Sequence, residues 1–453
     1  MPVILSAIRL LDDLRHLPLA THCHIALSGG LDSCVLLHLL ASINTELPWE
    51  LRAIHVHHGL QVDADRWQAH CETVCEHERI PLTTRYLGLQ PKSGESLEAL
   101  ARDARYQALA EEMGEGDLLL TAQHQDDQAE TLMLQLLRGS GPAGLAAMPA
   151  QSHFAKGWLV RPLLRFPRAS LEAYAQEQGL SWMEDPSNRD LRFDRNFIRH
   201  QVMPLLHTRW PSAAATLSRS ARLSGELLSL AREEAESDLI QVSLDDPRKL
   251  SISGLREFNS VRLRNLLRHW IASLGAPMPH SRQLARIESE AIHGRIDASP
   301  LVIWGGWELR RYRDELLLQS CSFSRQTLEP FDWPDKQSLD LPAGLGRLIA
   351  EPGLQGLSAN RWRAARVEVR FRVGGERCLP AGQAHHRPLK KLFQEWGLPP
   401  WERAHTPLIY LDGELAAIPG RLLCQPFAAA VGEAAIHLRW ERAVPIAASS
   451  PEE

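Results

Sequence analysis

Several features are scarce in this 453-residue sequence, and each scarcity argues against a class of protein. The seven cysteines are an odd number with no paired spacing, which argues against a disulfide framework and favours a reducing, cytoplasmic location. No apolar run is long enough to span a bilayer, and the N-terminus lacks a signal-peptide pattern, so we expect no membrane partner. The net charge of −5 is modest and leaves nucleic-acid binding open, because a mildly acidic protein can carry a basic face.

The most informative passage is a glycine-rich loop that follows the apolar run 25–27. This SGGLDS loop consists of Ser28, Gly29, Gly30, Leu31, Asp32 and Ser33. Glycines let the backbone turn sharply, the N–H groups at a helix start bind phosphate, and Asp32 can hold a magnesium ion. An ordinary strand–helix turn would explain the glycines alone. The loop is neither a Walker loop nor a dinucleotide fingerprint, and it resembles the PP-loop of enzymes that split ATP into AMP and pyrophosphate.

Strand-like and helical segments alternate up to residue 140. The expected strands are 24–27, 51–56, 83–87 and 117–121, and the expected helices are 31–43, 63–79, 96–113 and 124–138. This order predicts a doubly wound, Rossmann-like parallel sheet, with ligands at the carboxyl ends of its strands. An irregular, arginine-rich stretch follows to about residue 211. Beyond it, helices at 213–238 and 255–274 predict a mainly helical region, and 325–360 has the composition of a linker.

Polar residues gather after the second strand and on the third helix. His57 belongs to a histidine cluster, HVHHGL at 55–60, whose spacing does not converge well on one metal ion. Polar loop filling and contact with a nucleotide both remain open for it. Arg102 and Arg105 are i, i+3 neighbours, which is compatible with solvated charges or with phosphate pairing.

Carboxylates crowd the start of the helix that follows the fourth strand. Asp126, Asp127 and Glu130 lie within five residues of one another. Favourable interaction with the helix dipole explains one or two acids there, but three like charges repel unless a cation intervenes. Magnesium bound to ATP phosphates is a natural cation for such a site. We therefore interpret this helix start as part of a catalytic centre.

Two basic stretches point toward RNA. The loop-rich segment 182–199 mixes acids, aromatics and arginines, among them Arg195, and could cap an active site or hold RNA phosphate. Residues 361–391 contain nine Lys and Arg residues against two acids. An exposed sheet face would explain this excess, but clustered cations also release counterions from a nucleic acid, which favours phosphate binding.

Taken together, these motifs resemble the tRNA(Ile)-lysidine synthetase family. ARDARY at 101–106 is one of the matching pieces, and the more specific blocks are TAQHQDDQAETLMLQLLRGSGPAGLAAM at 121–148, RFRVGGERCLP at 370–380 and LKKLFQEWGLPPWERAHTPLIY at 389–410. Residues 215–350 resemble the family only weakly. The resemblance implies a PP-loop ATP-binding catalytic domain at 1–214, a helical tRNA-binding domain at 215–324, a linker at 325–360 and a small α+β tRNA-binding domain at 361–442.

The resemblance also implies an activity. An ATP-dependent ligase would adenylate the wobble cytidine of the CAU anticodon of tRNA(Ile) at O2, releasing pyrophosphate. Free L-lysine would then displace AMP at C2, which changes codon reading from AUG to AUA. The substrates and cofactors are thus ATP, Mg²⁺, L-lysine and tRNA(Ile), and the oligomeric state, monomer or homodimer, is left open.

Site residues follow from the same resemblance. The SGGLDS loop and His57 would bind ATP, and Asp32 would also bind Mg²⁺. The implied catalytic residues are Asp32, Arg105, Asp127 and Glu130, and the implied tRNA contacts are Arg195, Arg370, Arg372, Lys390 and Lys391. Gln123 stands where many family members have histidine, and it cannot accept the proton of the lysine amine.

Two other functions compete with this one. A tRNA thiolase would need cysteines that carry sulfur or an iron–sulfur cluster, and neither Cys34 nor the pair Cys71 and Cys75 supplies a C-x-x-C motif. An RNA-binding protein with a vestigial nucleotide domain would bind RNA without ATP turnover. The SGGLDS loop and the acidic helix start are both intact, which favours the ligase.

Overall fold

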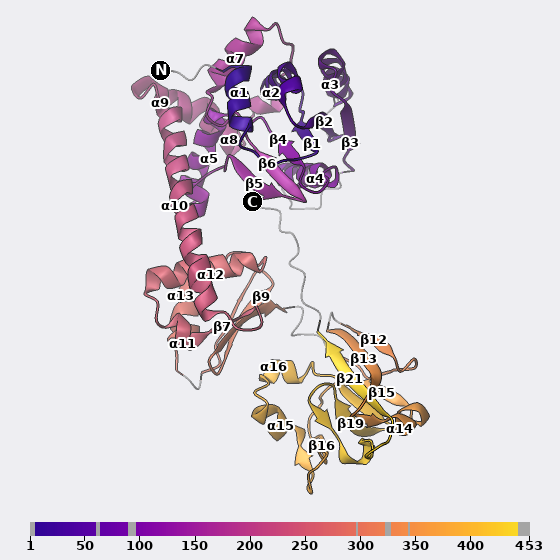
Figure 1. Ribbon diagram of the computed structural model, residues 1–453. Helices are drawn as coiled ribbons and strands as arrows, with labels where there is room; N and C mark the ends of the chain where they lie inside the picture. The colour runs from indigo at the N-terminus through magenta and orange to yellow at the C-terminus, as the bar shows by residue number, and fades with distance from the viewer. Residues whose placement is uncertain are drawn as a thin grey trace. The chain divides into compact units, whose positions relative to one another are not determined.

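The computed structural model describes residues 5–59, 64–88, 97–295, 298–321, 328–342 and 345–442. The chain divides into two compact units, the first running to Glu233 and the second from Glu234 to Ser450, and each is described by itself (Figure 1). Within the described ranges, none of the helices combines the length and the apolar character that a membrane span needs.

A six-stranded sheet forms the centre of the first unit, in the order β3-β2-β1-β4-β6-β5. The strands are β1 (His22–Ala26), β2 (Glu50–His57), β3 (Leu82–Tyr86), β4 (Leu118–Leu120), β5 (Gln151–Phe154) and β6 (Gly157–Val160). All neighbouring pairs are parallel except β5 with β6. The four predicted strands and the parallel, doubly wound class are confirmed.

The hairpin β5–β6 was not predicted, because 142–211 looked irregular. Its attachment to β4 depends on Gly157: a Cβ at this position would lie 2.0 Å from the Asp117 carbonyl oxygen. The next residue, Trp158, donates its backbone N–H to that same oxygen at 2.9 Å. A residue without a side chain therefore lets β6 approach β4 closely enough to pair.

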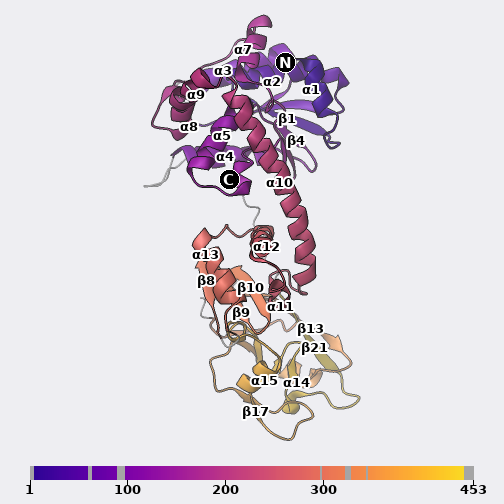
Figure 2. The same ribbon diagram turned by 90° about the vertical axis from the view of Figure 1, so that its left-hand side faces the viewer.

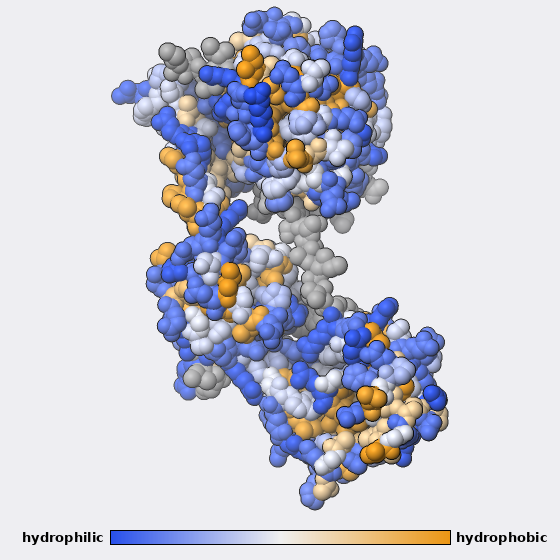
Figure 3. All heavy atoms as spheres, in the orientation of Figure 1, coloured by the Kyte–Doolittle hydropathy of each residue, from blue (hydrophilic) through white to orange (hydrophobic). Residues whose placement is uncertain are grey.

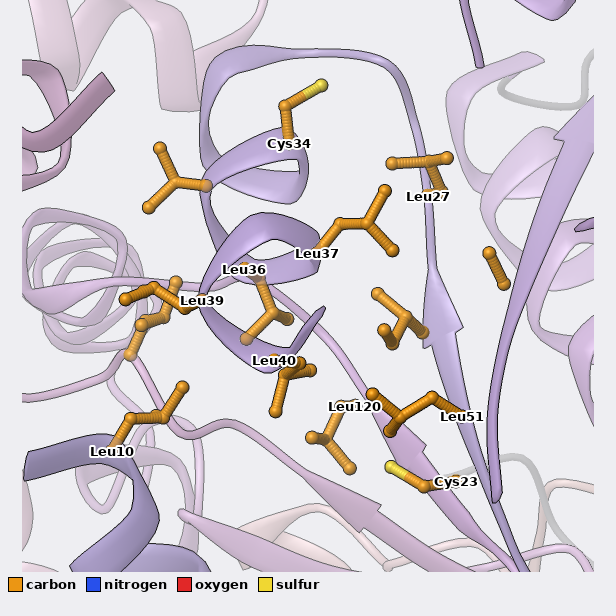
Figure 4. Close-up of a cluster of buried hydrophobic side chains, with 14 of the residues drawn as sticks. Leu10, Cys23, Leu27, Cys34, Leu36, Leu37, Leu39, Leu40, Leu51 and Leu120 are labelled. Carbon is orange, nitrogen blue, oxygen red and sulfur yellow. The ribbon is translucent and has the colours of Figure 1, made fainter. Parts of the chain in front are cut away.

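Helices cover both faces of the sheet, as expected for alternating strands and helices. The predicted helices correspond to α2 (Leu31–Ser42), α3 (Ala64–Glu78), α4 (Leu97–Glu111) and α5 (Gln125–Leu137). On one face, α2 packs with α1 (Ala7–Leu14), α3 and α7 (Arg168–Glu177). Figure 4 shows Leu37 of α2 pointing toward Leu27, and Leu40 toward Leu51 and Leu120. On the other face, α4 packs against alternate residues of β2 and β4.

The rest of the first unit is helical. It contains α6 (Pro142–Leu145), α8 (Asp194–Phe197), a π-helical turn (Ile198–Val202), α9 (Met203–Arg209) and most of α10 (Ala213–Val242). The α8 helix lies beside α5 in both views (Figure 1 and Figure 2), so the loop-rich segment that follows β6 returns to the acidic helix start. The prediction of a long helix from residue 213 is confirmed by α10.

The second unit begins with a helical part that also holds a sheet. The predicted helix at 255–274 corresponds to α12 (Ser260–Ser273), accompanied by α11 (Ile252–Leu255) and α13 (Ser281–Arg286). A four-stranded antiparallel sheet, which the sequence analysis did not anticipate, packs with them in the order β7-β10-β9-β8. Its strands are β7 (Lys249–Ser251), β8 (Leu301–Trp304), β9 (Trp307–Tyr312) and β10 (Glu315–Ser320). Trp270, Leu309 and Leu316 share its core.

The C-terminal part holds two larger antiparallel sheets and a short hairpin. One sheet has the order β11-β15-β18-β19-β20, the other β12-β13-β21-β14, and β16 pairs with β17. The strands are β11 (Phe331–Asp332), β12 (Ser338–Leu341), β13 (Gly346–Gly353), β14 (Leu357–Ser358), β15 (Val367–Arg370), β16 (Arg377–Cys378), β17 (Arg387–Pro388), β18 (Leu408–Leu411), β19 (Glu414–Ile418), β20 (Leu422–Leu423) and β21 (Ala435–Glu441). The helices are α14 (Ala359–Ala364), α15 (Leu389–Glu395) and α16 (Pro400–Arg403).

The predicted linker at 325–360 is wrong for its described residues. Strands β11 to β14 all lie within this segment: β11 pairs with β15, β13 and β14 pair with β21, and β12 pairs with β13. Leu341 and Leu348 point into the core of this part of the chain, as does Leu357. The many Pro, Gly and Asp residues thus mark turns between short strands and not a free connection.

Candidate active site

The SGGLDS loop joins β1 to α2 where the sheet order changes direction, since β1 lies between β2 and β4. Gly29 has a φ of +79°, and a Cβ there would lie 3.0 Å from the Cys71 sulfur. Gly30 is the N-cap of α2 and offers no side chain to its free N–H groups. These amides are therefore available to an anion, with the helix dipole favouring negative charge.

The two serines of the loop hold its shape. The Ser33 hydroxyl donates to the Gly30 carbonyl at 3.0 Å and accepts the Ser28 backbone N–H at 3.2 Å. The two hydroxyl oxygens lie 3.1 Å apart. Leu31 is buried in the core beneath the loop. Ser33 and Leu31 are buried and position the loop, whereas Ser28 is exposed.

Asp32 has the features of a cation ligand. Its Oδ1 atom is buried without a hydrogen-bond partner, and its Oδ2 lies 3.7 Å from His124 Nε2. Burial raises the pKa of the Asp32 carboxyl, while the charge of His124 opposes the rise. In the described ranges, no group of three His, Cys, Asp or Glu side chains is arranged to hold a metal alone. A magnesium ion at Asp32 would therefore take further ligands from phosphate, which is its usual habit.

His124 and Asp127 cap the start of α5 reciprocally. The His124 backbone N–H donates to Asp127 Oδ2 at 3.0 Å, and the Asp127 backbone N–H donates to His124 Nδ1 at 3.4 Å. His124 Nε2 lies 3.3 Å from Asp127 Oδ2. Burial alone would raise the pKa of Asp127, but the charges of His124 and two arginines outweigh it and lower the pKa.

Two arginines of the loop-rich segment close on these carboxylates. Arg195 contacts Asp127 at 3.1 Å and Glu130 at 3.0 Å, and Arg199 contacts both at 2.7 Å. Glu130 is only 2% exposed. Two negative and two positive charges thus form one part-buried cluster. Both acids were predicted from the sequence, and Arg195 was predicted as a tRNA contact. Arg199 and His124 were not predicted, although the i, i+4 spacing of the arginines in DRNFIR was an available signal for Arg199.

Arg105 is a half-buried cation with no carboxylate partner among the described residues. Burial lowers its pKa, and the neighbouring charges of Arg102 and Arg195 lower it further. Its guanidinium lies 5.6 Å from the centre of the Tyr106 ring. A guanidinium with no carboxylate partner in the described part of the chain is able to bind an anion such as phosphate.

Five buried polar atoms at the carboxyl edge of the sheet have no hydrogen-bond partner among the described residues. They follow β1, β2 and β4 and are Asp32 Oδ1, His58 Nδ1, Thr121 Oγ1, Gln123 Oε1 and His124 Nε2. Such atoms are rare in folded proteins unless a ligand or water satisfies them. His57, by contrast, is held by Asp65 at 3.2 Å and lies 5.1 Å from the Tyr86 ring, so its contact with ATP stays a prediction.

The predicted tRNA contacts of the second unit differ in how free they are. Arg370 donates to Glu368 at 2.8 Å, and Arg372 lies 3.7 Å from Glu376. Lys390 and Lys391 are exposed on α15, and no ion pair to either is found among the described residues. The two lysines are therefore better placed for phosphate than the two arginines.

Comparisons with known proteins agree with this geometry. Residues 7–206 match the PP-loop domain model, 250–317 the TilS substrate binding domain and 367–440 the TilS substrate C-terminal domain. A tRNA(Ile)-lysidine synthase of Coxiella burnetii is 42% identical over 89% of this chain and 90% of its own. Those of Serratia proteamaculans and Methylococcus capsulatus are each 44% identical, over 94% and 92% of this chain and 97% and 95% of their own. The chain therefore belongs to the tRNA(Ile)-lysidine synthase family of PP-loop, ATP-dependent ligases.

Proposed function

We propose that this protein joins free L-lysine to C2 of the wobble cytidine in the CAU anticodon of tRNA(Ile). The product, lysidine, changes codon reading from AUG to AUA. The single observation that carries the proposal is the SGGLDS loop beside the Asp127–Glu130 carboxylates at one edge of the sheet. That arrangement supplies an anion site for ATP next to a cation site for an amine.

The first step activates the cytidine. Its O2 is a poor leaving group, so O2 attacks the α-phosphorus of ATP, an O–P bond forms and pyrophosphate leaves. The amides of the SGGLDS loop and Arg105 would hold the phosphates. Asp32 would hold Mg²⁺, which neutralises phosphate charge when bound. Positioning and charge neutralisation are what phosphoryl and nucleotidyl transfer need most.

The second step uses lysine. Its ε-amine attacks C2, the C–O2 bond breaks, and AMP leaves with the oxygen. Asp127 and Glu130 are the carboxylates available for the lysine ammonium. They already bind Arg195 and Arg199, so the incoming ammonium must share them with a guanidinium or displace one. Gln123 cannot accept the amine proton, which excludes it as the general base.

The second unit supports tRNA binding, with Lys390 and Lys391 as the first candidates for phosphate contact.

If the protein forms a homodimer, α10 offers a surface for it. Apolar side chains gather on its face in Figure 3, and exposed Leu223, Leu227 and Leu230 follow coiled-coil spacing. Light scattering of the Leu227→Lys variant and of the unaltered protein tests this surface. If both have the mass of a dimer, α10 is excluded as the dimer interface.

We place the reaction in the cytoplasm, where the free thiols of the described cysteines are stable.

Mass spectrometry of tRNA(Ile) after incubation with ATP and isotopically labelled lysine tests the proposal. We expect label on the anticodon cytidine, with AMP and pyrophosphate released in equal amounts. A reaction without lysine and one with Asp32→Ala serve as controls. Transfer of sulfur, or binding of tRNA without any ATP turnover, would favour the competing functions instead.

A further inference from the structure

A groove in the C-terminal part of the second unit plays no part in the proposed reaction. It has a volume of about 610 Å³ and is lined by residues of 330–376 and by Tyr410 of β18. The segment RFRVGGERCLP, one of the blocks that carried the family resemblance, begins in β15 and forms part of its wall through Arg370, Val373 and Glu376. Val373 is 96% exposed at this edge, so the groove is open to a large ligand.

The groove contains a fixed stacking surface. The guanidinium carbon of Arg370 lies 4.4 Å from the centre of the Tyr410 ring. Glu368 accepts from Arg370 Nε at 2.8 Å and holds the plane in place. Phe331 and Phe371, with ring centres 6.2 Å apart, add a second aromatic surface. Arginine planes and aromatic rings are the side chains on which proteins stack unpaired bases.

Charge argues against a phosphate in this groove. The lining carries three carboxylates (Asp332, Glu368 and Glu376) against two arginines, and Arg366 is already bound to Asp332. Glu376 is also paired within the protein, because its Oε1 accepts the N–H groups of Val373 and Gly374 at 2.7 Å and its buried Oε2 lies 3.7 Å from Arg372 Nε. A lining with an excess of carboxylates, whose charges are paired within the protein, suits the uncharged ring of a base better than a phosphate.

We propose that this groove binds an unpaired nucleobase supplied by the substrate tRNA. The inference rests on the proposed function, because that function makes tRNA the partner. The base stacks on the Arg370–Tyr410 surface. Bases within a stem are stacked and paired, so the source is a loop or the single-stranded end of the tRNA. Pairing with Glu368 neutralises Arg370 and also orients its guanidinium plane for stacking.

The test is tRNA(Ile) affinity of the full-length protein at fixed salt. Arg370→Lys keeps the charge but loses the plane, and Tyr410→Leu loses the ring. Each should weaken binding about 5- to 100-fold, the range of one base–aromatic stack. Tyr410→Phe should stay within about twofold, because the stacking ring remains. Arg347→Lys is the matched control, since this exposed arginine pairs with Asp340 in the same part of the chain.

The following results would overturn the proposal or support it. Wild-type affinity of Arg370→Lys together with weakened Arg370→Gln would make Arg370 a phosphate contact and overturn the proposal. Ultraviolet crosslinking should join Phe331 or Tyr410 to an unpaired nucleotide, and crosslinks to paired nucleotides alone would also overturn it. If Tyr410→Leu does not fold, Arg370→Lys carries the test. Normal lysidine formation with unaltered affinities would refute the groove alone, whereas absent lysidine formation in the unaltered protein would refute the proposed function.

Discussion

Replacing Glu130 by glutamine should separate the two chemical steps and destabilise the fold at the same time. Glu130 is 2% exposed and accepts hydrogen bonds from Arg195 and Arg199 at 2.7–3.0 Å. The amide removes one negative charge and turns an NH₂ group toward guanidinium donors. One buried carboxylate then faces two cations.

The size of the effect follows from the exposure of the partners. Removing one member of a buried ion pair costs about 3–5 kcal/mol. Arg195 and Arg199 are 32% and 21% exposed, so water recovers part of that cost. We expect a loss of about 2–3 kcal/mol in the free energy of unfolding of the first unit. If charge imbalance is the cause, the double variant Glu130→Gln/Arg199→Gln should recover most of the loss.

The assay has two parts. Urea denaturation gives the stability change, with Glu172→Gln, an exposed partner of Arg168, as the control. Pyrophosphate release and lysine incorporation give the kinetic change, which should fall mainly on the lysine step as a raised KM for lysine. A stability loss below about 0.5 kcal/mol, typical of surface changes, would refute the burial argument. Equal losses in both kinetic steps would refute a lysine-specific role for Glu130.

Three further perturbations test other parts of the molecule. Asp32→Ala should abolish pyrophosphate release yet leave tRNA binding intact by filter assay, and normal turnover would remove the cation role. Lys390→Gln/Lys391→Gln should lower the salt slope of tRNA binding by about two, whereas an unchanged slope would make these lysines bystanders. Burial would raise the pKa of Asp117, but hydrogen bonds from the Gly114 N–H and His24 outweigh this and lower it. The Asp117 carboxylate therefore stabilises the fold above its pKa in the unfolded chain, about 3.9, and this stabilisation is lost as the pH falls. Asp117→Asn should weaken that acid dependence in pH-dependent unfolding, and an identical acid limb would contradict it.

The fold of the catalytic domain could be predicted from the sequence because the motifs and periodicities that indicate it are local. The SGGLDS loop and the strand–helix alternation up to residue 140 place the carboxyl edge of the sheet and hence Asp32 and Asp127. The hairpin β5–β6 and the strands of the second unit were missed, because short strands between turns lack a long periodic pattern.

The partners of charged residues were harder to predict than the residues themselves. Arg195 and Arg199 lie more than sixty residues from Glu130, and the packing of α8 and of the π-helical turn Ile198–Val202 against α5 brings them together. The excess of cations in residues 361–391 overstated the number of free positive charges. Glu368 and Arg370 lie two residues apart on β15, so their side chains point to the same face and pair with each other. Counting charges showed an excess of cations but not which of them were neutralised.

The fate of the cytidine O2 atom tests the central claim most directly. tRNA(Ile) carrying ¹⁸O at O2 of the wobble cytidine is incubated with the protein, ATP and lysine. The ¹⁸O content of the released AMP is then measured by mass spectrometry. Adenylation of O2 followed by attack of the lysine amine at C2 predicts ¹⁸O in AMP, in an amount equal to the lysidine formed. AMP without ¹⁸O, or lysine attached while the label stays on the base, would contradict the account.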